Sequence, residues 1–173
     1  MEQTTGQVLY EMNADAPMPP ASITKIMTLL LTFEAMDQGK FQYDTLLSCS
    51  EHAASMGGSQ IWLEPGEEMT VDEILRATFI SSANDAAVVL AEAVAGSEDA
   101  FVGMMNEKAK ELGMENTHFA NATGLDAQEH YSTARDIALM SAALLRYPDV
   151  TRYSTVWMDS LRGGTTELVN TNK

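Results

Sequence analysis

Ser22 and Lys25 lie three residues apart at the start of an apolar stretch, directly after Pro19 and Pro20. On a helix this spacing puts both side chains on one face, with Cβ atoms roughly 5–6 Å apart. A serine hydroxyl becomes an effective nucleophile when a base takes its proton, and lysine can be that base where burial lowers its pKa. The spacing therefore permits nucleophilic catalysis, although an isolated pair of this kind is more often a helix-start serine beside a solvated lysine.

A second polar cluster, Ser81-Ser82-Ala83-Asn84, interrupts two apolar stretches farther along the chain. Polar groups at a junction between buried elements need hydrogen-bond partners. Helix capping accounts for Ser81 or Asn84 taken alone, and two side chains that point into a shared site are the less common arrangement. The cluster therefore supplies candidates for a site without establishing one.

The elements that must position these residues are mostly helices. The apolar run at residues 23–37, closed by Gly39, predicts a helix that is buried nearly all round. Thr70 with Glu73 is a capping-box pattern that opens a second helix through residue 80. Further helices are predicted at residues 85–95, 97–112, 133–146 and 148–153.

Strands are predicted toward both ends of the chain. Residues 7–11 alternate like a half-buried strand after a turn at residues 4–6, with residues 1–3 as the end of a partner strand. Other strand-like runs are residues 45–47, 155–159 and 165–169. The order of strand, helices and strands predicts an α+β fold, with a helical cluster packed on an antiparallel sheet whose members come from both ends.

Length and charge narrow the classes of function. The chain has 173 residues, which suits one domain, and a formal net charge of −15. This charge argues against a nucleic-acid partner and against unaided binding to an anionic membrane. Cys49 is the single cysteine, so no internal disulfide can form. No stretch has the length of a membrane span, and the first residues lack the pattern of a signal peptide, so we expect any targeting or membrane segment to lie outside this chain.

The three histidines, His52, His118 and His130, have no close metal-ligand spacing. We interpret His118 and His130 as loop histidines and expect neither a metal ion nor a cofactor.

Taken together, these segments resemble the serine-type D-alanyl-D-alanine carboxypeptidases, which are the low-molecular-weight penicillin-binding proteins of peptidase family S11. The resemblance covers essentially the whole chain, and the order and spacing of its motifs make it specific. The matching stretches include residues 5–10, 20–25, 82–86, 105–109, 112–114, 116–119, 123–125 and 132–136. The resemblance implies a penicillin-binding-protein or β-lactamase-like fold.

The resemblance also implies a role for each matching residue. Ser22 would attack the carbonyl of the penultimate D-alanine, and Lys25 would act as its base. Ser82 would relay a proton to the leaving amine, and the Asn84 amide would hold the substrate backbone. The implied partners are a peptidoglycan stem peptide ending in D-Ala-D-Ala and β-lactam antibiotics, which would acylate Ser22. The resemblance also implies that the protein acts outside the cytoplasm.

One departure from the family pattern is serious. The family's Lys-Thr-Gly motif, on the strand that lines the other wall of the cleft, occurs nowhere in the chain, and the only late lysine is Lys173. We therefore expect residues 1–173 to be a partial catalytic domain whose sheet is incomplete, with weak or no labelling by penicillin. Ala83 and Ala122 replace the usual glycine and proline, and neither change removes a reactive group.

Three alternatives stay open at this stage. The scaffold also fits a β-lactamase or a D,D-endopeptidase, and the missing motif fits a non-catalytic fragment. Glu167 lies in a run similar to the deacylating glutamate motif of class A β-lactamases. It falls on a predicted strand far from Asn84, so we do not assign it that role.

Overall fold

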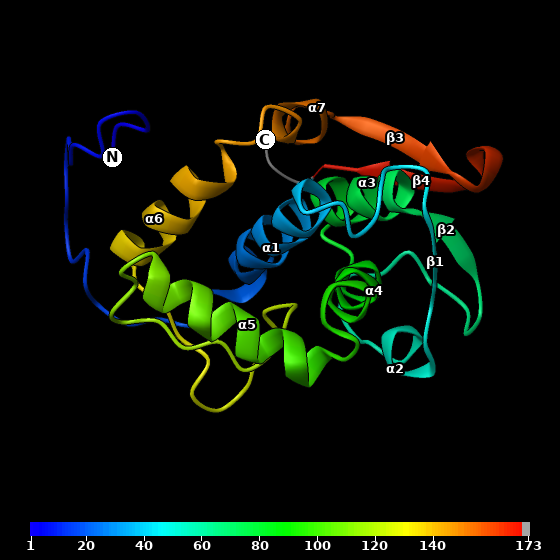
Figure 1. Ribbon diagram of the computed structural model, residues 1–173, viewed down its shortest axis with the longest axis horizontal. Helices are drawn as coiled ribbons and strands as arrows, with labels where there is room; N and C mark the ends of the chain where they lie inside the picture. Colours follow the sequence, from blue (N-terminus) through cyan, green and yellow to red (C-terminus); the bar gives the residue numbers. More distant parts are fainter. Residues whose placement is uncertain (171–173) are drawn as a thin grey trace.

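The computed structural model describes residues 1–170 as helices and short strands gathered around one central helix, α1 (Figure 1). Helix α1 packs against α4, α5 and α6, and α3 packs against α4 and the last strand. Lys173, the late lysine, lies outside the described residues. The helices are α1 (Lys25–Asp37), α2 (Glu51–Ala54), α3 (Val71–Ser81), α4 (Asn84–Ala95), α5 (Glu98–Glu111), α6 (Ala134–Leu144) and α7 (Val150–Ser154).

Helix α1 is buried on nearly every side, as its sequence predicts. Met27, Leu30 and Phe33 are each at most 3% exposed. Full burial of one such side chain contributes roughly 1.5–3 kcal/mol relative to an exposed one. The helix is therefore fixed along its length and gives a rigid support to the residues at its N-terminal end.

Capping residues set most of the helix boundaries. Thr70 and Glu73 form the predicted capping box before α3, in which the Glu73 N–H donates to Thr70 Oγ1 and the Thr70 N–H donates to Glu73 Oε2. Several boundaries differ from the prediction. The first helix begins as a 3₁₀ turn at Ala21–Thr24 and becomes α-helical only at Lys25. Helix α6 ends at Leu144 and not at residue 146, and α7 begins at Val150 and not at residue 148.

The strands form two separate antiparallel pairs in the described residues. Strand β1 (Leu46–Ser48) pairs with β2 (Glu68–Thr70), and β3 (Met158–Leu161) pairs with β4 (Thr166–Val169). The hairpin predicted near residues 163–164 is confirmed, although β3 begins three residues later than predicted. The prediction of one sheet with members from both ends of the chain is wrong for residues 1–170.

The N-terminal strand predicted at residues 7–11 is also wrong. The turn at residues 4–6 forms, because the Glu2 carboxylate accepts from the backbone N–H groups of Thr4 and Thr5. Beyond it the chain is extended and exposed, and it runs on the side of α6 away from β3 and β4 (Figure 1). A strand needs a partner for its backbone groups. Side-chain alternation alone could not reveal that no described strand lies beside this segment.

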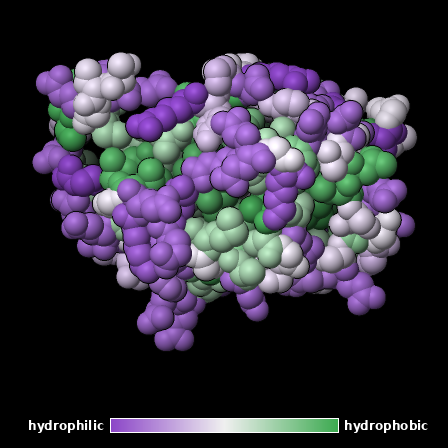
Figure 2. Space-filling view, in the orientation of Figure 1, coloured by the Kyte–Doolittle hydropathy of each residue, from purple (hydrophilic) through white to green (hydrophobic). Residues whose placement is uncertain are grey.

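Hydrophilic side chains cover much of the face shown in Figure 2. Apolar side chains reach the surface beside the N-terminal segment, where Val8, Met12 and Ala138 line a shallow cavity against α6. No helix in residues 1–170 combines the length and apolar character needed to cross a bilayer.

Candidate active site

Ser22 lies exposed on the 3₁₀ turn, while Lys25 at the first position of α1 is 3% exposed. Side chains three residues apart eclipse one another in a 3₁₀ turn. The Lys25 Nζ atom accordingly lies 3.3 Å from Ser22 Oγ and donates to the Thr123 carbonyl at 2.8 Å. At 3.3 Å the contact between Lys25 Nζ and Ser22 Oγ is at the long end of the hydrogen-bond range. The sequence-predicted pair is thus in contact.

Burial changes the ionisation of Lys25. Desolvation lowers the pKa of its amine from 10.5 to about 8. Lys25 Nζ contacts a hydroxyl and a carbonyl, neither of which carries a negative charge. Burial therefore disfavours the charged form of the amine, because no opposite charge compensates it. A substantial fraction of Lys25 is therefore neutral near pH 8 and able to accept a proton from Ser22.

Close backbone packing holds the Ser22 turn in place. Ala21 has a left-handed φ of 48°, and Gly124 lies directly against its carbonyl group. A Cβ atom at Gly124 would lie 1.8 Å from the Ala21 oxygen, so only glycine fits there. Thr28 Oγ1 also donates to the Ala122 carbonyl at 2.7 Å. The loop around Gly124 and the start of α1 therefore form one packed unit.

Ser82 ends α3 in a left-handed conformation, with a φ of 54°. This conformation costs a non-glycine residue of order 1–3 kcal/mol, and such strain is concentrated at functional sites. Ser82 lines the same cavity as Ser22 and Lys25, whose volume is about 340 Å³. No hydrogen bond joins Ser82 Oγ to Lys25 within residues 1–170, so the structure brings the two together in one cavity without direct contact.

Asn84 begins α4 and is 5% exposed. Its Nδ2 atom donates to the Gly57 carbonyl at 2.7 Å, and its backbone N–H donates to the Ser59 carbonyl at 2.7 Å. Asn84 therefore fastens the loop of residues 57–59 beside the site. Within the described part of the chain its Oδ1 atom accepts no hydrogen bond, and Asn84 is not among the described residues that line the cavity with Ser22, Lys25 and Ser82.

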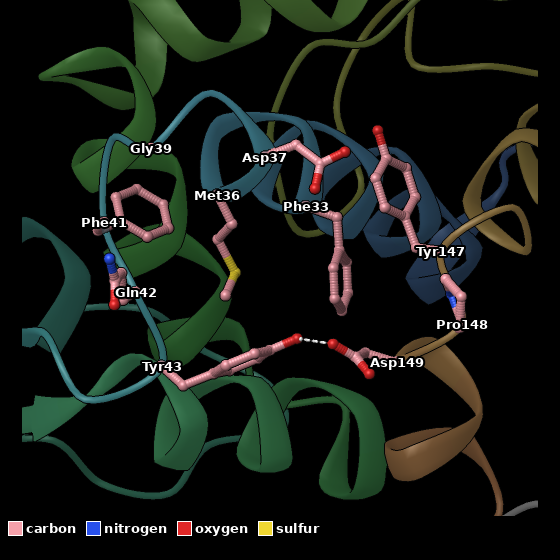
Figure 3. Close-up of a pocket in the computed structure, with 10 residues that line it drawn as sticks. All are labelled: Phe33, Met36, Asp37, Gly39, Phe41, Gln42, Tyr43, Tyr147, Pro148 and Asp149. Carbon is pink, nitrogen blue, oxygen red and sulfur yellow. Dashed lines mark hydrogen bonds between the residues drawn. The ribbon is translucent and has the colours of Figure 1, made fainter.

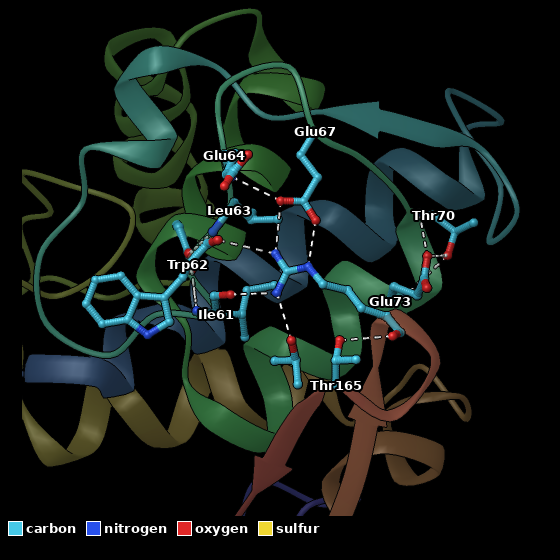
Figure 4. A network of polar contacts seen from close by, with 11 residues as sticks. Ile61, Trp62, Leu63, Glu64, Glu67, Thr70, Glu73 and Thr165 are labelled. Carbon is cyan, nitrogen blue, oxygen red and sulfur yellow. Dashed lines mark hydrogen bonds and ion pairs between the residues drawn. The ribbon is translucent and has the colours of Figure 1, made fainter.

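Two residues that the sequence did not single out fix the rest of that loop. Asp85 is fully buried and accepts from the backbone N–H groups of Ile61 and Leu63. Arg162 donates to the Ile61 and Trp62 carbonyls and forms an ion pair with Glu67. These three partners are labelled in Figure 4. For Asp85 the sequence signal was an acidic residue at the start of a helix that is apolar apart from Asn84 and Glu92, and Arg162 had no such signal.

A second cavity of about 340 Å³ lies at the other end of α1 (Figure 3). Phe33 and Tyr147 stack beside it, and Tyr43 donates to Asp149 across it at 2.5 Å. The residues among 1–170 that line it include none of the predicted site residues and no serine or lysine. The reactive groups therefore gather at the N-terminal end of α1.

Solved structures of the same fold define the class of protein. Penicillin-binding protein 6B from Escherichia coli superposes with a TM-score of 0.92 at 32% identity, over 99% of this chain and 56% of that one. Penicillin-binding protein D2 from Listeria monocytogenes, solved in an ampicillin-bound form, gives a TM-score of 0.80 at 32% identity, over 99% and 69%. The fold is therefore that of the penicillin-binding proteins.

Sequence comparison gives the family. A sequence model of the D-alanyl-D-alanine carboxypeptidase family, peptidase S11, matches residues 1–173, and the chain belongs to this family. The D-alanyl-D-alanine carboxypeptidase DacF of Bacillus subtilis is 53% identical over 100% of this chain and 45% of its own length. The predicted family and fold class are confirmed. The chain spans less than half of DacF, and the roles of Ser22, Lys25, Ser82 and Asn84 stay predictions.

Proposed function

We propose that the protein is a serine D-alanyl-D-alanine carboxypeptidase that removes the terminal D-alanine from peptidoglycan stem peptides. The observation that carries this proposal is the desolvated Lys25 amine in contact with the exposed Ser22 hydroxyl. Residues 1–173 supply part of one catalytic domain. The substrate places its action outside the cytoplasm, and β-lactams are covalent inhibitors because they acylate the same serine.

The residues divide the reaction between them. Neutral Lys25 takes the Ser22 proton while Ser22 Oγ bonds to the penultimate carbonyl carbon. The backbone N–H of Ser22, which has no acceptor in residues 1–170, stabilises the resulting oxyanion. When the oxyanion collapses, the bond between the carbonyl carbon and the nitrogen of the terminal D-alanine breaks, and Ser82 passes its proton to that leaving amine while it takes up the proton held by Lys25. Asn84 Oδ1 accepts from the substrate backbone. Water then hydrolyses the acyl-enzyme and regenerates the Ser22 hydroxyl.

The direct test measures D-alanine release by a chain extended to the length of its relatives. We expect release from a pentapeptide ending in D-Ala-D-Ala and none from the matched peptide ending in D-Ala-L-Ala. Cleavage only of cross-linked dimers would favour an endopeptidase instead. Rapid multiple turnover of penicillin would favour a β-lactamase.

The lowered pKa of Lys25 predicts the pH dependence of acylation. Acylation needs the neutral amine, so its rate should rise with pH and level off above pH 8, where the amine is mostly deprotonated. Between pH 6 and pH 8 the neutral fraction rises roughly fifty-fold. Stopped-flow acylation by a chromogenic β-lactam measures this profile.

The matched control is Lys25→Arg, which keeps a positive charge that cannot be lost. We expect it to slow acylation by about 10²–10⁴-fold at every pH tested. A wild-type rate that does not change from pH 6 to pH 9 would remove Lys25 from the role of base.

A further inference from the structure

His130 is the buried member of the three histidines, at 6% exposed, and lies outside the groups assigned above. The residues that follow His130 form two isolated antiparallel β-bridges, Tyr131 with His118 and Ser132 with Met18. Met18 comes just before the prolines that lead to Ser22. The segment therefore lies between the loop that carries Thr123 and the turn that carries the candidate nucleophile.

The hydrogen bonds of His130 define its proton position. The Ala120 backbone N–H donates to Nδ1 at 2.9 Å, so Nδ1 carries no proton. The proton of the neutral ring is then on Nε2, which lies 2.8 Å from Thr24 Oγ1 and donates to it. Burial lowers the pKa of the ring; His118 acts in the same direction, and Asp126 opposes it.

Both partners of the ring belong to the candidate site. Thr24 is fully buried between Ser22 and Lys25, and its side chain makes no capping bond to α1. Its hydroxyl is held by His130 instead. Ala120 begins the loop whose Thr123 carbonyl receives Lys25 Nζ. A single imidazole therefore joins the turn that carries the nucleophile to the loop that orients the base.

We propose that His130 is a positioning residue for acylation, which holds the Ser22 turn and the loop of residues 120–124 in fixed register through its Nε2–H tautomer. The inference rests on the function proposed above. Without the ring, Thr24 and the Ala120 N–H lose their shared partner, and the turn can shift relative to Lys25. A misplacement of about 1 Å at a catalytic group can cost 10²-fold in rate.

Two substitutions separate this role from simple filling of space. His130→Gln keeps an acceptor for Ala120 and a donor for Thr24 on one planar group, whereas His130→Leu keeps bulk and loses both. In the extended protein we expect His130→Leu to slow acylation by penicillin about 10²-fold and His130→Gln to stay within about threefold of wild type. His118→Leu is the control, since that exposed ring hydrogen-bonds to the Glu129 carbonyl, whereas the bonds to Thr24 and Ala120 are made by His130, and it should change the rate less than twofold.

The pH profile gives a second readout. Protonation of His130 would set an Nδ1–H against the Ala120 N–H, and two donors cannot share a hydrogen bond. Wild-type acylation should therefore fall more steeply at acid pH than the titration of Lys25 alone requires. His130→Gln, which does not titrate, should lose this extra steepness while it keeps the Lys25 limb.

The outcomes separate cleanly. The inference is overturned if a folded His130→Leu variant acylates at the wild-type rate, if His130→Gln is as slow as His130→Leu, or if the extra acid steepness persists in His130→Gln. Should His130→Leu fail to fold, the rate and pH profile of His130→Gln decide. A wild-type protein that is never acylated would refute the proposed function itself, and every other adverse outcome leaves that function standing.

Discussion

Ser22→Ala is expected to abolish covalent labelling by penicillin in the chain extended to the length of its relatives. Ser22 Oγ is the atom that lies 3.3 Å from the desolvated Lys25 amine, and alanine leaves nothing to form the ester. Loss of the nucleophile in a serine hydrolase costs roughly 10⁶-fold in rate. Intact-mass spectrometry should show one penicillin per wild-type chain and no adduct on the variant.

The fold should survive this substitution. Ser22 is exposed, and changes at such positions usually alter the free energy of unfolding by less than about 0.5 kcal/mol. Ser81→Ala, one residue from Ser82 at the end of α3, is the matched control and should keep full labelling. Persistent labelling of Ser22→Ala, with the adduct on another residue, would refute the proposed nucleophile.

The sequence predicted the contacts that are local in the chain. Ser22 and Lys25 meet because three-residue spacing determines which side chains share a face, and the Thr70–Glu73 box forms for the same kind of reason. Ser82 joins them in one cavity, and family resemblance rather than local pattern predicted this. Sequence spacing therefore predicts side-chain contacts reliably when the two residues lie within one helical turn of each other.

Long-range partners could not be predicted in this way. Lys25 donates to Thr123, which is 98 residues away, and Thr24 meets His130 across 106 residues. A single histidine in a loop has no periodicity that would show whether its ring is buried. The strand prediction for residues 7–11 was wrong for a related reason. Alternation of apolar and polar side chains describes the two faces of a strand and does not show whether a partner strand is present.

The largest effect expected outside the reactive groups is that of Gly124→Ala. Gly124 has a φ of +86°, which strains any other residue, and the new Cβ would lie 1.8 Å from the Ala21 oxygen and 3.0 Å from Thr24 Oγ1. Backbone cannot yield to an overlap of this size without moving the Ser22 turn. We expect the free energy of unfolding to fall by at least about 3 kcal/mol and acylation to slow by about 10²-fold or more.

Gly96→Ala isolates the cause, because Gly96 has the same φ of +86° at the end of α4, and a Cβ atom added there would have no neighbouring atom within 4 Å. It carries the backbone strain without the overlap, which should cost about 1 kcal/mol and leave acylation unchanged. Urea unfolding and penicillin acylation of both variants measure the difference. If both variants lost the same stability and the same acylation rate, the positive φ alone would explain why glycine is needed at position 124. A loss of acylation in Gly124→Ala but not in Gly96→Ala would show that the backbone contact between Gly124 and Ala21 positions the proposed nucleophile. Gly124 is distant from Ser22 in the sequence, so the spacing of residues around Ser22 could not predict this contact.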